Sequence, residues 1–286
     1  MRFLFSIIFM IFYMCQTAMA QDELAEAKSA YEEEMFMKVL KITDGLVTED
    51  PKSAPAWLIQ GNALQKLEDY QGAISSYKRA LKLNDNSPEI LTNLGVAYFN
   101  SDDISTAYKY LKKAIKLNDS YSPAHYFMGN LEYAEFKSKS ALKCYQRALE
   151  LNPKYRDALY MRSAVYFEMQ DYQKALQDLN EVMDIDPSLE RAKFNKAIIL
   201  ITAENYSEAM DVLNEVEPKL LEKQTDYFYY LGEAQYFSGK KEDACNSYSK
   251  AAELGDTESE EIYTQFCLTK AERKSREQKR TISISF

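Results

Sequence analysis

The stretch that decides the fold runs from residue 54 to residue 87, APAWLIQGNALQKLEDYQGAISSYKRALKLNDNS. Residues 88–121 repeat its pattern as PEILTNLGVAYFNSDDISTAYKYLKKAIKLNDSY. Small residues recur in the two segments at the same places, and large apolar residues recur between them. A fixed period of this length indicates an array of stacked structural units, each too small to bury an apolar face alone.

The period of 34 residues extends to both sides of this stretch. Small side chains at repeated positions allow two helices to approach closely, and larger residues fill the spaces between them. The chain has only eight glycines and seven prolines, which favours helices with short connections over a turn-rich β-fold. The small residues that recur every 34 positions are Gly61, Gly95 and Gly129, then Ala73, Ala107, Ala141, Ala175 and Ala209, and finally Ala80, Ala114 and Ala148.

The array resembles the tetratricopeptide repeat (TPR) family, and residues 54–87 carry the resemblance most plainly through Trp57, Gly61, Tyr70, Ala73 and Tyr77. The resemblance implies an all-α fold, a TPR solenoid in which about seven helix-turn-helix repeats form a right-handed superhelix. We expect the TPR array to span residues 21–257. Its repeats are expected to start near residues 20, 54, 88, 122, 156, 190 and 225.

The N-terminus has the pattern of an export signal. Arg2 precedes a short apolar run, and Ala18-Met19-Ala20 then supplies the small residues of a cleavage site. We therefore expect residues 1–20 to be a signal peptide that is cut between Ala20 and Gln21, and the mature chain to be periplasmic or secreted. A lipoprotein would use Cys15, but this alternative is disfavoured because the residue before it is a methionine and not a small residue.

The C-terminal part differs from the repeats. Residues 258–280 predict one longer helix that caps the last repeat and ends in a basic half. Its basic residues leave open a peripheral contact with an anionic membrane, beside plain solvation of a helix end. Residues 281–286 alternate apolar and polar side chains, so addition of this tail as a strand to a partner's sheet is a further alternative.

Composition and motifs exclude several kinds of site. His125 is the only histidine, which excludes metal sites that need two, and no GxSxG motif supports a triad around it. No glycine-rich phosphate-binding loop is present. With 35 basic and 44 acidic residues the net charge is −9, which disfavours nucleic acid and favours basic partners. We expect no metal, no other cofactor and no enzymatic activity.

Three cysteines remain after the signal, namely Cys144, Cys245 and Cys267. Cys245 falls in the second helix of the last repeat, and Cys267 falls in the capping helix that should pack on it. Cys144 lies about three repeats away, beyond the reach of a disulfide. In an oxidising compartment we therefore expect a disulfide between Cys245 and Cys267. The alternative is that all three cysteines are small buried apolar residues.

The resemblance also indicates where a partner would bind. In TPR families the first helix of each repeat lines a concave groove, and the inward positions of this chain carry rings and amides. Rings supply contact area and asparagine can pair with main-chain groups, which suits a peptide or helix, although these residues could also simply follow the repeat consensus. The expected partner-binding groove residues are Asn62, Phe99, Tyr126, Asn130, Tyr133, Tyr160, Phe167, Phe194, Tyr229, Glu233 and Tyr236.

The sequence thus favours a non-enzymatic scaffold of the cell envelope that holds a protein or peptide partner in an aromatic groove. Two other classes stay open. One is an oligomerisation module or a non-catalytic subunit of an envelope enzyme complex. The other is an enzyme with an unrecognised carboxylate site.

Overall fold

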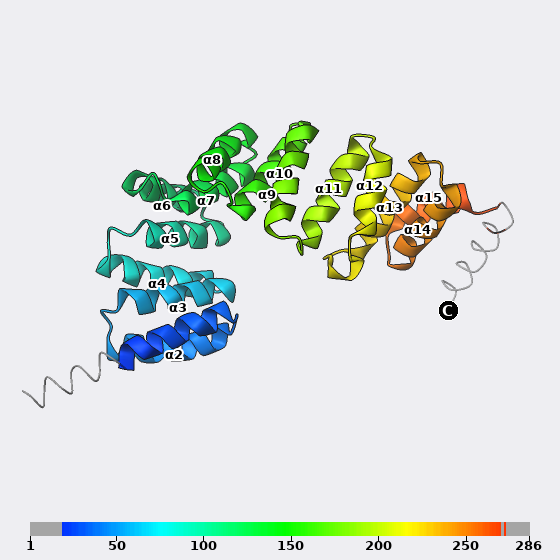
Figure 1. Ribbon diagram of the computed structural model, residues 1–286. Coiled ribbons are helices and arrows are strands. Elements are labelled where there is room, and N and C mark those ends of the chain that lie inside the picture. Colours follow the sequence, from blue (N-terminus) through cyan, green and yellow to red (C-terminus); the bar gives the residue numbers. More distant parts are fainter. Residues whose placement is uncertain (1–18, 270–271, 273–286) are drawn as a thin grey trace, which may run out of the picture. The chain divides into compact units, whose positions relative to one another are not determined.

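The computed structural model describes residues 19–269 and residue 272 (Figure 1). These residues form helices and no strand, and the chain divides into two compact units, Met1–Pro153 and Lys154–Phe286. Of the expected signal peptide, residues 1–18 lie outside the described residues, as does the tail 281–286. Within the described part of the chain, no helix is long and apolar enough to cross a membrane.

The first unit is a series of helices that pair in chain order. Residues 19–32 are helical, and α3, α5 and α7 begin 34 residues apart. Each of these three packs most extensively on the helix that follows it. The all-α repeat fold that the sequence predicts is therefore confirmed here. The remaining elements are α2 (Phe36–Glu49), α3 (Ala54–Lys66), α4 (Tyr70–Leu83), α5 (Pro88–Asn100), α6 (Ile104–Leu117), α7 (Ser122–Ala134) and α8 (Ser138–Leu151).

The second unit continues the pattern with one interruption. Its helix α12 has only nine residues, and a short 3₁₀ helix, Pro218–Leu220, follows it. Pro218 lacks a backbone N–H and cannot continue an α-helix, which explains why α12 stops early. The elements are α9 (Arg156–Glu168), α10 (Tyr172–Ile185), α11 (Glu190–Thr202), α12 (Tyr206–Asn214), α13 (Gln224–Phe237), α14 (Lys241–Glu253), α15 (Thr257–Ile262) and a π-helical turn, Tyr263–Cys267.

Each helix pair is joined by a turn through one residue with a positive φ angle. The last of these turns uses Gly239, at φ 81°. The others use non-glycine residues with φ between 57° and 67°, a conformation that costs an L-residue about 1–2 kcal/mol. The close pairing of the two helices imposes this geometry whatever residue stands there. The six non-glycine residues, spaced 34 apart, are Glu34, Glu68, Asp102, Phe136, Gln170 and Glu204.

Glycines in the first helices make room for tyrosine rings from the second helices. A Cβ atom added at Gly129 would lie 2.5 Å from the ring of Tyr145, which is fully buried. The same clash, at 2.5 Å, would occur between Gly61 and Tyr77. A side chain at either glycine would therefore push the two helices of its pair apart. The third pair of this kind is Gly232 with Tyr248, at 2.9 Å.

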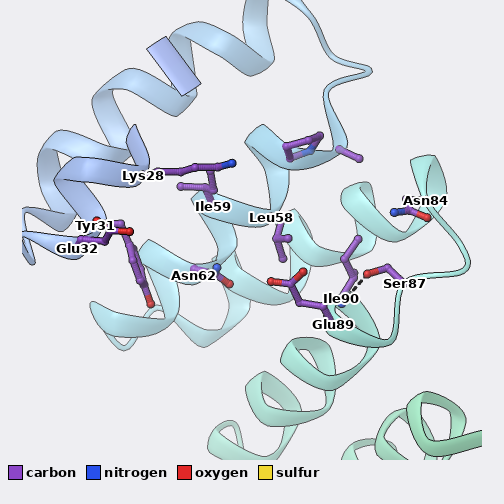
Figure 2. A pocket seen from close by; sticks show the side chains of 12 residues that line it. Lys28, Tyr31, Glu32, Leu58, Ile59, Asn62, Asn84, Ser87, Glu89 and Ile90 are labelled. Carbon is purple, nitrogen blue, oxygen red and sulfur yellow. Dashed lines mark hydrogen bonds between the residues drawn. The ribbon is translucent and has the colours of Figure 1, made fainter. Parts of the chain in front are cut away.

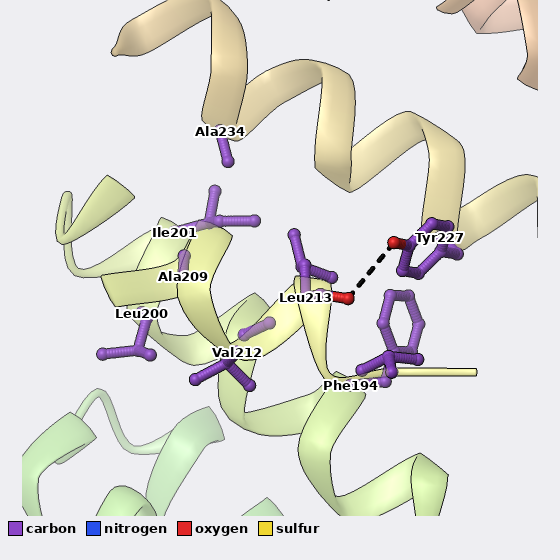
Figure 3. Close-up of a cluster of buried hydrophobic side chains, with 10 residues drawn as sticks. Phe194, Leu200, Ile201, Ala209, Val212, Leu213, Tyr227 and Ala234 are labelled. Carbon is purple, nitrogen blue, oxygen red and sulfur yellow. Dashed lines mark hydrogen bonds between the residues drawn. The ribbon is translucent and has the colours of Figure 1, made fainter. Parts of the chain in front are cut away.

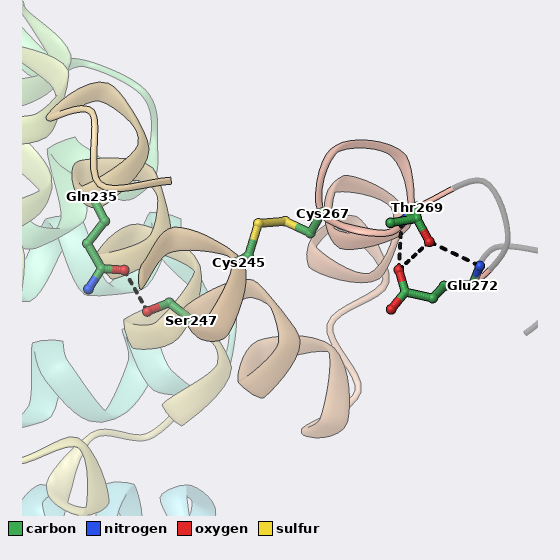
Figure 4. Close-up of a disulfide and its surroundings, with 6 residues drawn as sticks. All are labelled: Gln235, Cys245, Ser247, Cys267, Thr269 and Glu272. Atoms are coloured by element: carbon green, nitrogen blue, oxygen red, sulfur yellow. Dashed lines mark hydrogen bonds between the residues drawn. A yellow bond between two sulfur atoms is a disulfide. The ribbon is translucent and has the colours of Figure 1, made fainter. Parts of the chain in front are cut away.

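The C-terminal helix is shorter than the sequence predicts, and one continuous helix over residues 258–280 is wrong. The helical residues end at Cys267, and Leu268 has extended backbone angles. Two features explain the break (Figure 4). Cys267 is bonded to Cys245 of α14. Thr269 and Glu272 also form a capping box, in which the Glu272 carboxylate accepts the Thr269 N–H at 2.8 Å and the Thr269 hydroxyl accepts the Glu272 N–H at 3.3 Å.

These two bonds satisfy the backbone N–H groups of Thr269 and Glu272 outside the helical segment that ends at Cys267. Residues 270–271 and 273–280, which carry the basic half of the expected helix, lie outside the described residues.

Candidate functional site

In the first unit a cavity of about 460 Å³ lies among helical residues 19–32, α3 and the start of α5 (Figure 2). Asn62 of α3 lines it, but the Asn62 side-chain oxygen already accepts the Tyr77 hydroxyl at 2.8 Å and the Asn93 amide at 3.0 Å. Tyr77 is buried, so this oxygen is the partner that its hydroxyl needs. Asn62 therefore serves first to hold the helix pair together.

The matching asparagine in α7 is used in the same way. The Tyr145 hydroxyl donates to the Asn130 side-chain oxygen at 2.8 Å, and burial holds the pKa of Tyr145 above its ordinary value. The ring centroid of Tyr126 lies 4.9 Å from that of Phe127 and 6.2 Å from that of Tyr145. The two asparagines predicted to grip a peptide are thus part of the packing between helices.

The remaining predicted residues of the first unit are half-buried. Phe99 packs beside the cluster that contains Leu111, Met128 and Leu131. Tyr133 is half-buried on α7. Each offers part of one ring face and no free polar group to a partner, so this region provides contact area more than specificity.

In the second unit, the rings of α9 are linked to α11 and to α10. The Tyr160 hydroxyl accepts the Asn195 side-chain amide at 2.8 Å, and the guanidinium of Arg191 lies 5.3 Å from the centre of the Tyr160 ring. Burial raises the pKa of Tyr160. The Phe167 ring lies 5.9 Å from that of Tyr172. Two residues of α11 thus hold Tyr160, and its hydroxyl is already paired.

Phe194 is mostly buried in the core of the second unit (Figure 3). It also lines a cavity of about 600 Å³ with residues of α11 and α13, so its role in a groove stays a prediction. Only 8% of Phe194 is exposed, and its ring lies 5.8 Å from that of Tyr230 and 6.5 Å from that of Tyr227. The Tyr227 hydroxyl donates to the Leu213 carbonyl at 3.1 Å. The Leu213 carbonyl at the end of α12 also accepts the Val216 N–H at 3.1 Å, so Tyr227 adds a second donor to it.

The predicted groove residues of α13 come together at the C-terminal end of this unit. Tyr229, Glu233 and Tyr236 line a cavity of about 340 Å³ with residues of α14 and of the segment that ends at Cys267. Tyr236 is 41% exposed. The sequence analysis missed two further exposed rings of this lining, Phe237 and Phe266, which are 56% and 69% exposed. Phe266 stands in the capping segment, and an exposed apolar ring there is the feature that points to a contact surface.

Glu233 lines this cavity, and its carboxylate interacts with that of Glu258 outside the lining. Burial and the charge of Glu258 raise the pKa of Glu233. The Tyr229 hydroxyl donates to the Glu258 carboxylate at 3.3 Å, and the pKa of Tyr229 rises to about 12, mainly through burial. The Tyr248 ring lies 6.1 Å from that of Tyr229. Carboxylates enclosed by rings favour a cationic group, because the charge and the ring faces attract it together.

The disulfide between Cys245 and Cys267 forms part of the cavity wall (Figure 4). Their Cα atoms are 5.6 Å apart, within the ordinary range for a disulfide. Beside it, the Ser247 hydroxyl donates to the Gln235 side chain at 2.8 Å and ties α14 to α13. Whether the purified protein holds this bond stays a prediction, which peptide mapping under non-reducing conditions checks. Cys144 is a free thiol whose pKa burial raises to about 11.

Other expected features lie away from this cavity. His125 is buried, and its Nε2 lies 2.9 Å from the Asp119 carbonyl, which fits a structural role. Ala20 and Gln21 fall within helical residues 19–32, and cleavage between them stays a prediction. Among the described residues, no group of three metal-ligating side chains of the His, Cys, Asp or Glu type comes together.

Comparisons with known families match three segments of the chain. The family described as "TPR repeat" matches residues 61–102, and the family described as "Tetratricopeptide repeat" matches residues 88–121. The chain carries tetratricopeptide repeats. A third family, "Anaphase-promoting complex, cyclosome, subunit 3", matches residues 134–216. This TPR chain matches no curated protein.

Several solved structures share the fold of the TPR chain at low sequence identity. The pilF protein of Pseudomonas aeruginosa has 14% identity and a TM-score of 0.65, over 73% of this chain and 96% of its own. A thermophilic TPR protein of Thermus thermophilus has 18% identity and a TM-score of 0.58, over 64% and 99%. A TPR protein of Parabacteroides merdae has 16% identity and a TM-score of 0.56, over 85% and 97%. The TPR fold indicates a protein–protein interaction scaffold.

Proposed function

We propose that this TPR protein is an exported, non-enzymatic scaffold that holds a basic segment of a protein partner in the cavity at the end of α13. The observation that carries the proposal is the 340 Å³ cavity, which Glu233 lines together with rings of α13 and α14. Export rests on the signal pattern before Gln21.

The chemistry of the lining favours a lysine or arginine side chain. Tyr229, Tyr236 and Tyr248 line the cavity, and a cation over the face of an aromatic ring gains about 0.5–2 kcal/mol, more when water is excluded. A bound cation would also offset the burial that raises the pKa of Glu233. Lys241 lines the same cavity and opposes this charge, so the cation must sit nearer to Glu233 than to Lys241.

Exposed rings at the cavity supply the rest of the contact. Tyr236, Phe237 and Phe266 are each at least 41% exposed, and a partner that covers them would bury apolar surface around the paired charges. Such a ring at the centre of an interface typically contributes about 2 kcal/mol or more. The scaffold would therefore bind through a ring-lined pocket with a polar centre, a common pattern for peptide sites.

The test compares capture by the mature chain and by two matched ring deletions. Tyr236→Ala should lower capture of an arginine-containing peptide at least tenfold, while a glutamate-containing peptide of the same length binds neither protein. Phe136→Ala removes a ring that is 94% exposed in the first unit, and should leave capture unchanged. Moderate salt should weaken the capture that remains. Equal capture by both variants and wild type would reject this cavity as the site.

Export is tested separately by the intact mass of protein purified from the native host. The proposal requires a chain that begins at Gln21. A mass that retains residues 1–20, or a lipid on Cys15, would contradict it. A cross-linking pull-down from envelope extract with Tyr236→Ala as the negative control would then identify the partner.

A further inference from the structure

Three consecutive second helices of the first unit are strongly basic. Helix α4 carries three basic residues and no acidic one, α6 carries four and no acidic one, and α8 carries three and one acidic residue. These helices together have a net charge of +9, in a chain whose total is −9. The overall charge therefore conceals a concentrated positive surface.

The cations lie on the outer sides of these helices. The inner side of α6 is buried through Ala107, Leu111 and Ala114, which leaves its four lysines exposed. None of the nine exposed cations has an ion-pair partner among the described residues. We define the basic face by these residues: Lys78, Arg79 and Lys82 of α4, Lys109, Lys112, Lys113 and Lys116 of α6, and Lys139 and Lys143 of α8.

The cations recur in the register of the repeat, so they face the same way on neighbouring helices. Arg79 and Lys113 are 34 residues apart, as are Lys82 and Lys116. Lys109 and Lys143 share a third register position. Helices that begin and end at equivalent residues present equivalent positions on the same side.

The second unit carries the opposite charge at the same three register positions. Glu181 and Glu215 occupy the position of Lys113, Asp184 that of Lys116, and Asp211 that of Lys109. All four acidic residues are exposed. We define the acidic face by these residues: Glu181 and Asp184 of α10, Asp211 of α12, and Glu215, which follows α12.

We propose that the basic face of one copy of this chain docks on the acidic face of a second copy. The chain itself supplies both partners, with charges at matching spacings along the same kind of helix. This contact is separate from the peptide cavity of α13 and does not depend on it. Because each copy leaves one face of each kind free, the contact joins copies head to tail and is open-ended.

Other anionic partners fit the observations less well. The cations are nearly all lysines on an outer helical surface, where they act as point charges and lack the bidentate geometry with which arginine binds phosphate. The net charge of −9 opposes the approach to a nucleic acid or an anionic membrane. A second copy has the same net charge, but its acidic face lies at spacings that match the cations.

Sedimentation of the mature full-length chain tests the contact. In about 10 mM salt, where the Debye length is about 30 Å, the average mass should rise with protein concentration. It should return to the monomer mass in about 1 M salt, where that length is about 3 Å. Wild-type protein that stays monomeric in low salt would overturn the proposal, including the case in which it then sediments with phosphatidylserine vesicles.

Matched charge reversals identify the two faces. One variant carries Lys109→Glu, Lys113→Glu and Lys116→Glu, and the other carries Asp211→Lys, Glu181→Lys and Asp184→Lys at the same register positions. Each variant alone should lose self-association, because both of its faces then have like charge. An equimolar mixture should regain it. If the mixture stays monomeric while both variants keep wild-type helical content, the proposed pairing of faces is wrong.

Discussion

Two helix pairs, one in each unit, are packed alike but have different polar neighbours. In the first unit, the Tyr145 ring fills the space above Gly129 and its hydroxyl donates to Asn130. In the second unit, Tyr248 packs on Gly232 in the same way, but the residue after the glycine is Glu233. The glycine and ring are required by the fold, whereas the next residue decides what the groove can do.

The difference has a simple electrostatic origin. An asparagine is neutral, so one tyrosine hydroxyl satisfies its half-buried oxygen. That oxygen then needs no hydrogen bond from a ligand. A half-buried carboxylate is costly to charge, as the raised pKa of Glu233 shows, and a cationic ligand offsets that cost. The same position therefore stabilises the helix pair in one unit and carries a half-buried carboxylate in the other.

The largest expected effect separates a buried ring from an open one. Phe194→Ala should lower the free energy of unfolding by about 3–5 kcal/mol, because it empties the space below Tyr227 and Leu213. Tyr236→Ala, at an exposed site, should change it by less than about 1 kcal/mol. Denaturant titration of both variants checks this. Equal stability of the two would mean that Phe194 is not the core residue described here.

The next effect tests the space that glycine provides. Gly129→Ala should destabilise the protein by about 1–3 kcal/mol, since its Cβ would meet the Tyr145 ring. Gly45→Ala is the matched control inside α2, where a Cβ meets nothing within 4 Å, and it should stabilise by up to about 1 kcal/mol. In thermal melts the melting temperature should fall for Gly129→Ala and rise for Gly45→Ala. A destabilised Gly45→Ala would contradict the open space at that site.

A stability effect of similar size tests the hydrogen bond that distinguishes the first unit. Asn130→Ala leaves the Tyr145 hydroxyl without its acceptor and should cost about 1–3 kcal/mol. Tyr145→Phe removes the hydroxyl itself and should cost less. In the double variant the two effects should not add, because they remove the same bond. If denaturant titrations show that the two losses in the free energy of unfolding add, Asn130 acts through a contact other than this hydrogen bond.

The smallest stability effect concerns Glu233, and its sign depends on pH. Its pKa is raised in the folded state, so the folded protein holds the Glu233 proton more tightly than the unfolded chain does. That contribution is fully present below the unfolded pKa and is lost as pH rises through the folded pKa. Glu233→Gln should therefore gain stability relative to wild type as the pH rises from acidic to neutral. A constant difference between the two proteins over that range would contradict the raised pKa.

The sequence by itself determined the parts that depend on a regular period. A spacing of 34 residues places α3, α5, α7, α9 and α11, because each repeat packs on a copy of its own pattern. The glycines opposite tyrosine rings follow from the same spacing. The change from basic to acidic residues at equivalent positions of the two units was also present in the sequence. The net charge of the chain hides this change, and the exposed sides of the helices reveal it.

The tertiary structure alone decided the features where the period fails. The early end of α12 turns Phe194 into a core residue, since a missing helical turn leaves space that only neighbouring side chains can fill. The end of the helical segment at Cys267 depends on a bond to α14 and on the capping box after it. The predicted groove residues of α13 line one cavity together with residues of this segment. Apart from the pairing of Cys245 with Cys267, which the sequence predicts, such contacts join residues that no repeat pattern relates.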